Sequence, residues 1–129
     1  MASENSIITK YRRIKLAQIT AGVLTTIPRI QYIALGDGGV DASGEPIAPT
    51  EDAIALTNEL VRLEVDPPTF PVETTVRYSV TLSKTEFAGY KFNEMALVDA
   101  DNQLCAIKTM YTKQKDDDVI FTFEFDDEF

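Results

Sequence analysis

The residues of this chain whose types could do chemistry are acidic side chains and glycines, because its 129 residues include no histidine. Gly36-Asp37-Gly38-Gly39 is a glycine-rich turn after an apolar run, and turns of this kind can hold a phosphate. The segment lacks the G-x-G-x-x-G spacing, the lysine of a Walker loop and a helix that begins at the last glycine. It therefore predicts a tight turn at which two backbone segments approach closely, and no nucleotide site.

A second acidic segment, Asp99-Ala100-Asp101-Asn102-Gln103, places oxygen ligands at alternate positions, as a calcium-binding loop does. Such a loop requires glycine at its sixth position and glutamate at its twelfth, but Leu104 and Tyr111 stand there. Asp and Asn tolerate a positive φ and hydrogen-bond to their own backbone. The segment therefore predicts the turn of a β-hairpin, and no metal site is expected.

Paired carboxylates could catalyse glycoside hydrolysis, which requires carboxyl groups about 5 Å or about 6.5 to 9.5 Å apart. Spacing along the chain places no two candidates at either separation. Without histidine, and with one cysteine, Ser-His-Asp sets, Cys-His sets and the usual zinc sites cannot be assembled. We expect a protein that is not an enzyme and holds no cofactor, with a carboxylate-dependent hydrolase as the catalytic alternative. The candidate glutamates are Glu59, Glu64, Glu73, Glu86 and Glu94.

Composition argues against several other classes of function. The formal net charge of -9 opposes binding to nucleic acid or to anionic membrane surfaces. No stretch approaches the roughly 20 apolar residues of a membrane span, and residues 1–5 lack the basic and apolar regions of a signal peptide. Cys105 lies in an apolar run, where a small buried hydrophobe fits. Synthesis in a cytoplasm is expected.

Charge is unevenly distributed along the chain. Residues 1–29 carry five basic side chains and one acidic one, whereas residues 30–129 carry seven basic and 20 acidic side chains. A basic element can dock on its own acidic domain or on a neighbouring copy, or it can be a solvated helix face. The basic residues taken as interface candidates are Lys10, Arg12, Arg13 and Lys15.

Two helices are predicted from periodicity and capping residues. Apolar residues at helical spacing indicate a helix over residues 6–21, with Ser6 or Asn5 as its N-cap and Gly22 as its end. Thr50 followed by acidic residues indicates a short helix over residues 50–58. The turn-rich segment 36–50 is predicted as a long loop, and such loops are usually functional or mobile.

Extended segments make up most of the remaining chain. Arg62 and Glu94 lie within two of them and could form a cross-strand pair. Length and element order predict one domain over residues 1–129, of the α+β class, with the N-terminal helix packed on a mostly antiparallel sheet of about six strands. The predicted strands cover residues 23–27, 30–35, 60–65, 72–82 and 119–125, together with a hairpin over 92–110.

Four segments in this order resemble the N-terminal domain of tail-collar fibre proteins of tailed bacteriophages and related contractile injection particles. The resemblance covers nearly the whole chain. Asn102 stands where the family usually has the glycine of the hairpin turn, and asparagine tolerates the same backbone. The segments are the helix Thr9 to Gly22, Ala34-Leu35-Gly36-Asp37-Gly38, Leu56-x-Asn58-Glu59-x-x-Arg62, and Glu94-x-x-Leu97-x-Asp99-Ala100-Asp101 with its return Leu104-x-Ala106-Ile107.

The resemblance implies a structural part of the virion tail, made in the cytoplasm of a bacterial host, that fixes a side fibre to the baseplate without catalysis. It also implies a homo-oligomer, with a trimer favoured because fibres of this kind are threefold, and contact with baseplate and other tail proteins. A typical fibre continues into a shaft and a receptor-binding tip. If Phe129 ends the gene product, we expect a collar, adaptor or baseplate-peripheral protein.

The surfaces expected to contact other proteins are the helix at 6–21 and the loop at 36–50, with Asp37 and Arg62 as further interface candidates. The alternative function is a stand-alone adhesion or carbohydrate-binding module of a tail. Five tyrosines could serve as sugar platforms, although tryptophan is absent.

Overall fold

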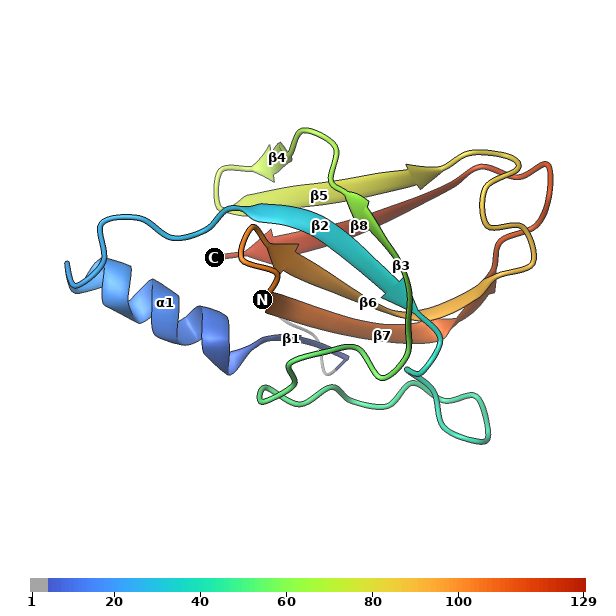
Figure 1. Cartoon of the computed structure of the whole chain (residues 1–129), viewed down its shortest axis with the longest axis horizontal. Coiled ribbons are helices and arrows are strands. Elements are labelled where there is room, and N and C mark those ends of the chain that lie inside the picture. The colour runs from blue at the N-terminus through green and yellow to red at the C-terminus, as the bar shows by residue number, and fades with distance from the viewer. Residues whose placement is uncertain (1–4) are drawn as a thin grey trace.

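A computed structural model describes residues 5–129 and shows two antiparallel β-sheets and one helix among them (Figure 1). Residues 1–4, to which most of the signal-peptide expectation applies, lie outside the described residues. The larger sheet has the strand order β1-β7-β6-β2-β3 and the smaller one β4-β5-β8. The elements are β1 (Ser6–Ile8), α1 (Lys10–Thr20), β2 (Ile30–Gly36), β3 (Glu59–Glu64), β4 (Thr69–Val72), β5 (Thr75–Leu82), β6 (Lys91–Asp99), β7 (Leu104–Gln114) and β8 (Phe121–Glu128).

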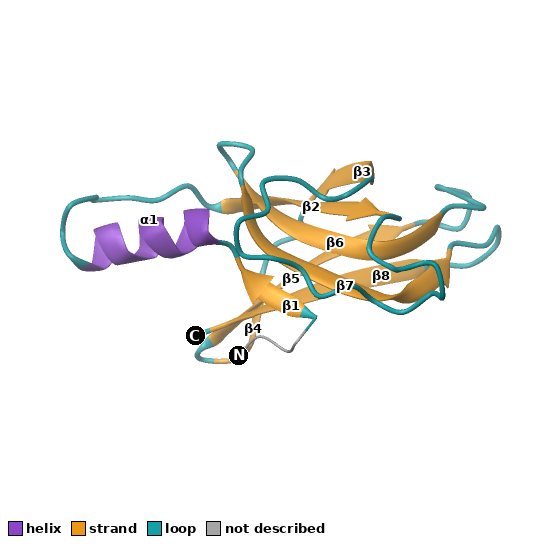
Figure 2. Cartoon of the chain, turned by 90° about the horizontal axis from the view of Figure 1, so that it is seen from below, coloured by secondary structure: helices purple, strands orange, loops and turns teal. Residues whose placement is uncertain are grey.

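The two sheets pack face to face, and the side chains between them form the main core (Figure 2). Phe92 of β6 and Phe123 of β8 come from different sheets, and their ring centroids lie 5.7 Å apart, edge to face. The expected α+β fold, with a helix packed on a six-stranded sheet, is therefore wrong, because the described residues are mostly β. Alternating apolar residues identify a strand but not the sheet that it joins. Here the apolar face of each sheet packs against the other sheet instead of against a helix.

A smaller apolar cluster lies on the outer face of the larger sheet. Ala34 and Ala96 of its central strands face Leu56, which belongs to the long connection between β2 and β3. Strand β6 is consequently buried on both faces, from Phe92 to Asp99. Residues 37–58, named the acidic loop below, thus act as a third layer over the sheet.

Helix α1 begins later than expected. Ser6, the expected N-cap, lies in β1 and pairs with Lys108 of β7. Thr9 caps the helix instead, because its hydroxyl accepts from the N–H of Arg12 at 3.4 Å. Gly22 is confirmed as the end of the helix, since its φ of 78° lets the following N–H of Val23 reach the carbonyl of Gln18 at 2.9 Å.

The body of the helix does not pack on the sheets as expected. It extends away from one end of the sandwich (Figures 1 and 2), and Arg12 is its sole fully buried residue. The side chain of Ile14 is 47% exposed. The first turn is therefore anchored, whereas Leu16 and Ile19 further along the helix are only half-buried.

Three other local predictions were wrong. Residues 50–58 form no helix, because the N–H groups of Thr57 and Asn58 donate to the Glu94 carboxylate instead of to preceding carbonyls. Residues 23–27 form no strand. The expected strand 72–82 is divided by a turn, and its missed partner β4 carries Pro71, which suits its edge position.

The predicted hairpin of β6 and β7 is confirmed. Asn102 adopts a φ of 63°, and the carboxylate of Asp99 accepts from the N–H groups of Asp101 and Gln103 at 2.9 and 3.0 Å. The final strand β8 is confirmed as well, with Phe123 and Phe125 buried toward the core. Local turn chemistry and strand alternation were therefore sufficient in these two places.

Candidate functional site

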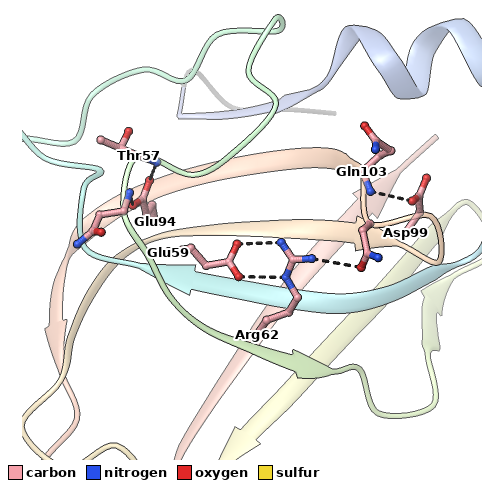
Figure 3. Close-up of polar contacts among 8 residues, drawn as sticks. Thr57, Glu59, Arg62, Glu94, Asp99 and Gln103 are labelled. Atoms are coloured by element: carbon pink, nitrogen blue, oxygen red, sulfur yellow. Dashed lines mark hydrogen bonds and ion pairs between the residues drawn. The ribbon is translucent and has the colours of Figure 1, made fainter.

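The carboxylate of Glu94 fixes the acidic loop to the larger sheet. Its Oε2 accepts from the N–H groups of Gly38 at 2.8 Å and Asn58 at 2.9 Å, and its Oε1 accepts from Thr57 at 3.0 Å. Glu94 is 2% exposed. Figure 3 shows this carboxylate directed at Thr57. Because both oxygens accept backbone hydrogen bonds, Glu94 holds together the beginning and the end of the acidic loop.

The glycines of the Gly36-Asp37-Gly38-Gly39 turn allow this close approach. A Cβ on Gly36 would overlap the carbonyl oxygen of Asn58, and one on Gly39 would overlap that of Asn93. The side chain of Asn93 also accepts from the N–H of Gly39 at 2.7 Å. The expectation that the turn brings two backbone segments close together is confirmed.

Arg62 does not pair with Glu94, contrary to expectation. Its guanidinium makes a bidentate contact with Glu59, at 2.9 and 3.0 Å, and its Nη1 donates to Asn102 at 3.4 Å. Figure 3 shows these contacts beside the β6–β7 hairpin turn, which carries Asp99 and Gln103. Arg62 therefore ties β3 to the hairpin turn, while Glu94 serves the loop.

Two contacts anchor the first turn of α1 to the sandwich. The hydroxyl of Tyr11 donates to Oδ2 of Asp99 at 2.8 Å. Burial, followed by this hydrogen bond, raises the pKa of Tyr11 well above its ordinary value. Arg12 Nη1 lies 2.7 Å from Asp127 Oδ2 of β8, and both atoms are buried. The helix start is thereby joined to both sheets.

The acidic loop differs sharply from α1 in charge. It carries Asp37, Asp41, Glu45, Glu51 and Asp52, and it has no lysine or arginine. Its Ile54 is 84% exposed, and Ile47 is also exposed. The acidic loop and the helix therefore carry opposite charges, and each also exposes apolar side chains.

A cavity of about 190 Å³ lies under the acidic loop and is lined mostly by apolar residues, together with three threonines and Glu94. That carboxylate is already bonded to three backbone N–H groups. Among residues 5–129, no three Cys, Asp or Glu residues are grouped so that they could hold a metal ion. Over the same residues, no helix is long and apolar enough to cross a membrane.

The chain can now be compared with known proteins. A family model described as phage tail-collar fibre protein, N-terminal, matches residues 1–119. The chain belongs to this family. Neither the curated proteins nor the solved structures gave a match. The resemblance drawn from the sequence motifs is confirmed, and membership makes the chain a component of the virion tail, with a structural role.

In this tail-collar fibre domain, the sequence motifs of the family meet one another. Gly36-Asp37-Gly38, Asn58-Glu59 and Glu94 converge at one end of the larger sheet, and Arg62 reaches the hairpin turn of Asp99 to Asn102. The side chains of four motif residues thus make hydrogen bonds within the chain: Asp37, Arg62, Glu94 and Asp99. The motifs build the scaffold that positions α1 and the acidic loop.

The six interface candidates lie on three parts of this tail-collar fibre domain. Lys10, Arg12, Arg13 and Lys15 lie on α1, Asp37 in the acidic loop, and Arg62 on β3. Arg13 forms an ion pair with Glu51, and Asp37 accepts from Asn58 Nδ2 at 2.6 Å. Arg12 is occupied by Asp127 inside the chain. Lys10 and Lys15 have no carboxylate partner among residues 5–129, and contact of the six with other proteins stays a prediction.

Sequence reasoning missed three residues that position these surfaces: Tyr11, Asn93 and Asp127. Asn93 directly precedes Glu94 inside an apolar strand, and a polar residue in such a place is a sign of a buried hydrogen bond. Asp127 interrupts the run of alternate phenylalanines on β8 in the same way. Nothing in the sequence connects Tyr11 to Asp99, 88 positions away.

Proposed function

We propose that this chain is an attachment domain that fixes a tail fibre at the baseplate of a phage or of a phage-tail-like particle. It acts as a structural part, without catalysis, and as one domain over residues 1–129. Its surfaces for other proteins are α1 and the acidic loop, together with the exposed basic residues Lys10 and Arg13 and the half-buried Lys15.

The observation that carries this proposal is the contrast between the motif residues and the exposed surfaces. Glu94, Asp99 and Arg62 are engaged within the chain, so none is available to act on a small molecule. Ile14 of α1 and Ile54 of the acidic loop are exposed beside charges of opposite sign, and such complementary charge favours contact with other protein.

Family membership supports the location and partners in this proposal. The chain would be made in the cytoplasm of a bacterial host and would assemble there with copies of itself, as a trimer, and with baseplate proteins. Threefold assembly follows the symmetry of tail fibres. The charge difference between α1 and the acidic loop would set the orientation of these contacts.

Deletion of the coding sequence in the cell that produces the particles tests the proposal. We expect particles with tails but without attached fibres in electron micrographs, and recovery when the wild-type chain is supplied from a plasmid. Fibres attached in normal number after deletion would contradict the proposal. Loss of binding to host glycans with fibres still attached would favour the adhesion module instead.

A surface variant makes the same test specific. Changing Lys10 and Lys15 to glutamate leaves the buried Arg12–Asp127 pair intact, so the fold should persist while fibre attachment falls. Lys84→Glu and Lys91→Glu together make the same charge change at two exposed lysines at the opposite end of the sandwich from α1, and serve as the control. Normal attachment by the helix variant, or equal loss in the control, would contradict a role for α1.

A further inference from the structure

We infer that α1 of one copy binds the acidic loop of a neighbouring copy, so that the assembly is built head to tail from two different surfaces. This inference rests on the proposed function and names the partner of its contact surfaces. The partner is a second copy of this chain.

The helix half of this interface is basic and has exposed apolar side chains. Lys10, Arg12, Arg13 and Lys15 are its charged residues, and it contains no carboxylate. Past Tyr11 and Arg12 it has no buried residue, and Ile14 is 47% exposed. Isolated helices shorter than about 12 to 15 residues are marginal in water, so an 11-residue helix that projects from its domain gains stability from a covering partner.

The loop half is the complement of the helix in charge and offers apolar contact as well. Asp52 has no cationic partner among residues 5–129, and Ile54, two positions away, is 84% exposed. Glu94 and the close backbone approach at Gly36 hold the loop in place. A fixed, acidic and partly apolar surface can receive a basic helix with little loss of loop entropy.

The helix contacts the acidic loop of its own chain at its first turn. Its contacts there are Arg13 with Glu51 and the N–H of Lys10 with the carbonyl of Glu51, both at the first turn. Beyond that turn the helix runs away from the sandwich (Figure 2). Ile14 and Lys15, and the last turn of the helix, therefore remain for another copy.

Contact between α1 and the acidic loop allows more than one symmetry of the assembly. A contact between unlike patches is heterologous, and it closes into a ring when its rotation is a simple fraction of a full turn. In a twofold dimer, α1 of each copy would lie on the acidic loop of the other, so that opposite charges also meet. The mass measured in solution distinguishes this dimer from a ring. Head-to-tail contact is therefore compatible with the threefold assembly proposed above.

A second candidate surface for self-association, beside β8, has no surface of opposite charge to pair with. An open groove of about 480 Å³ lies beside the edge of β8, lined by Met110, Ile120 and Phe121. Its charged residues are of both signs, Lys108 and Lys113 against Glu124. Variants at Ile120, which is 57% exposed, therefore serve as the control for variants at Ile54.

Measurement of molecular mass in solution, over a range of concentrations of the full chain, tests the inference. We expect the wild type to associate, and Lys15→Glu or Asp52→Lys to weaken association by about ten-fold because each places like charges together. The double variant with both changes should recover association. Asp117→Lys, which makes the same charge change as Asp52→Lys on another exposed turn, should associate like the wild type.

The apolar part of the contact is tested with Ile14→Ser, Ile54→Ser and Ile120→Ser. The first two should weaken association and the third should not. A monomeric wild type at every concentration, no recovery in the double variant, or greater loss with Ile120→Ser would overturn the inference. If the chain is nevertheless found on tails, the proposed function stands; if association follows the prediction but tails lack the chain, the proposed function fails alone.

Discussion

The guanidinium of Arg12, in the first turn of α1, lies 2.7 Å from the carboxylate of Asp127, near the end of the last strand. The two side chains are 10% and 1% exposed, and the paired atoms have no other hydrogen-bond partner among residues 5–129. The pair joins elements that are more than one hundred positions apart in the sequence. A charge buried in this way is costly when its partner is removed.

Arg12→Ala should destabilise the chain by about 3 to 5 kcal/mol, because it leaves the Asp127 carboxylate buried without a partner. Urea unfolding followed by circular dichroism measures the change. The double variant Arg12→Met/Asp127→Leu removes both charges and should recover most of the loss. Arg77→Ala breaks the exposed pair with Asp126 and should lower the free energy of unfolding much less. An equal loss would contradict a larger contribution of the buried pair to stability.

Glu94→Gln should loosen the acidic loop more than it disturbs the sheets. The amide nitrogen takes the place of one carboxylate oxygen and cannot accept there. Either the N–H of Thr57, or those of Gly38 and Asn58, therefore lose their acceptor, and we expect a loss of about 2 to 3 kcal/mol. Hydrogen exchange should become faster at these N–H groups first. Glu86→Gln, at an exposed carboxylate, is the control, and unchanged exchange in the loop of Glu94→Gln would contradict its anchoring role.

Gly39→Ala should cost about 3 kcal/mol, because its Cβ would overlap the backbone carbonyl of Asn93, which cannot rotate away. Gly44→Ala is the comparison. That glycine has open space around it but a φ of 86°, so the cost there is the backbone strain of about 1 kcal/mol. Thermal unfolding ranks the two variants, and an equal or reversed ranking would show that the turn is not closely packed.

Alkaline pH should destabilise the chain through Cys105. Burial raises the pKa of this thiol from 9.0 to about 12, so the unfolded chain releases the proton at a lower pH than the folded one. Unfolding free energy should therefore fall as the pH rises from about 9 to about 12. Cys105→Ala should have a shallower decline in urea unfolding measured across that range. Parallel declines would contradict a buried thiol.

Strands with clear alternation and turns with specific chemistry could be predicted from the sequence. The β6–β7 hairpin follows from Asp99 to Asn102, and β8 from its alternate phenylalanines. Fold class could not be predicted, because pairing of β5 with β8 depends on contacts between residues about 45 positions apart. β1 was missed because Ile7 and Ile8 fit a helical stripe with Tyr11, while in the structure they pair with β7.

Motif positions at the candidate site were predicted better than the roles of single side chains. The closeness of backbones at Gly36 was expected, whereas the link between Glu94 and the ends of the acidic loop was not. A carboxylate that accepts from N–H groups more than thirty positions away has no local sequence pattern. The basic stretch of α1 was recognised, but the burial of Arg12 among its exposed neighbours was not.

Location of the chain on purified particles tests its role as a tail attachment domain most directly. Gold-labelled antibodies against residues 5–129, viewed by electron microscopy, should bind where the fibres meet the baseplate, and mass spectrometry of the same particles should detect the chain. Absence of the chain from purified particles, or label distributed over the head, would contradict that role.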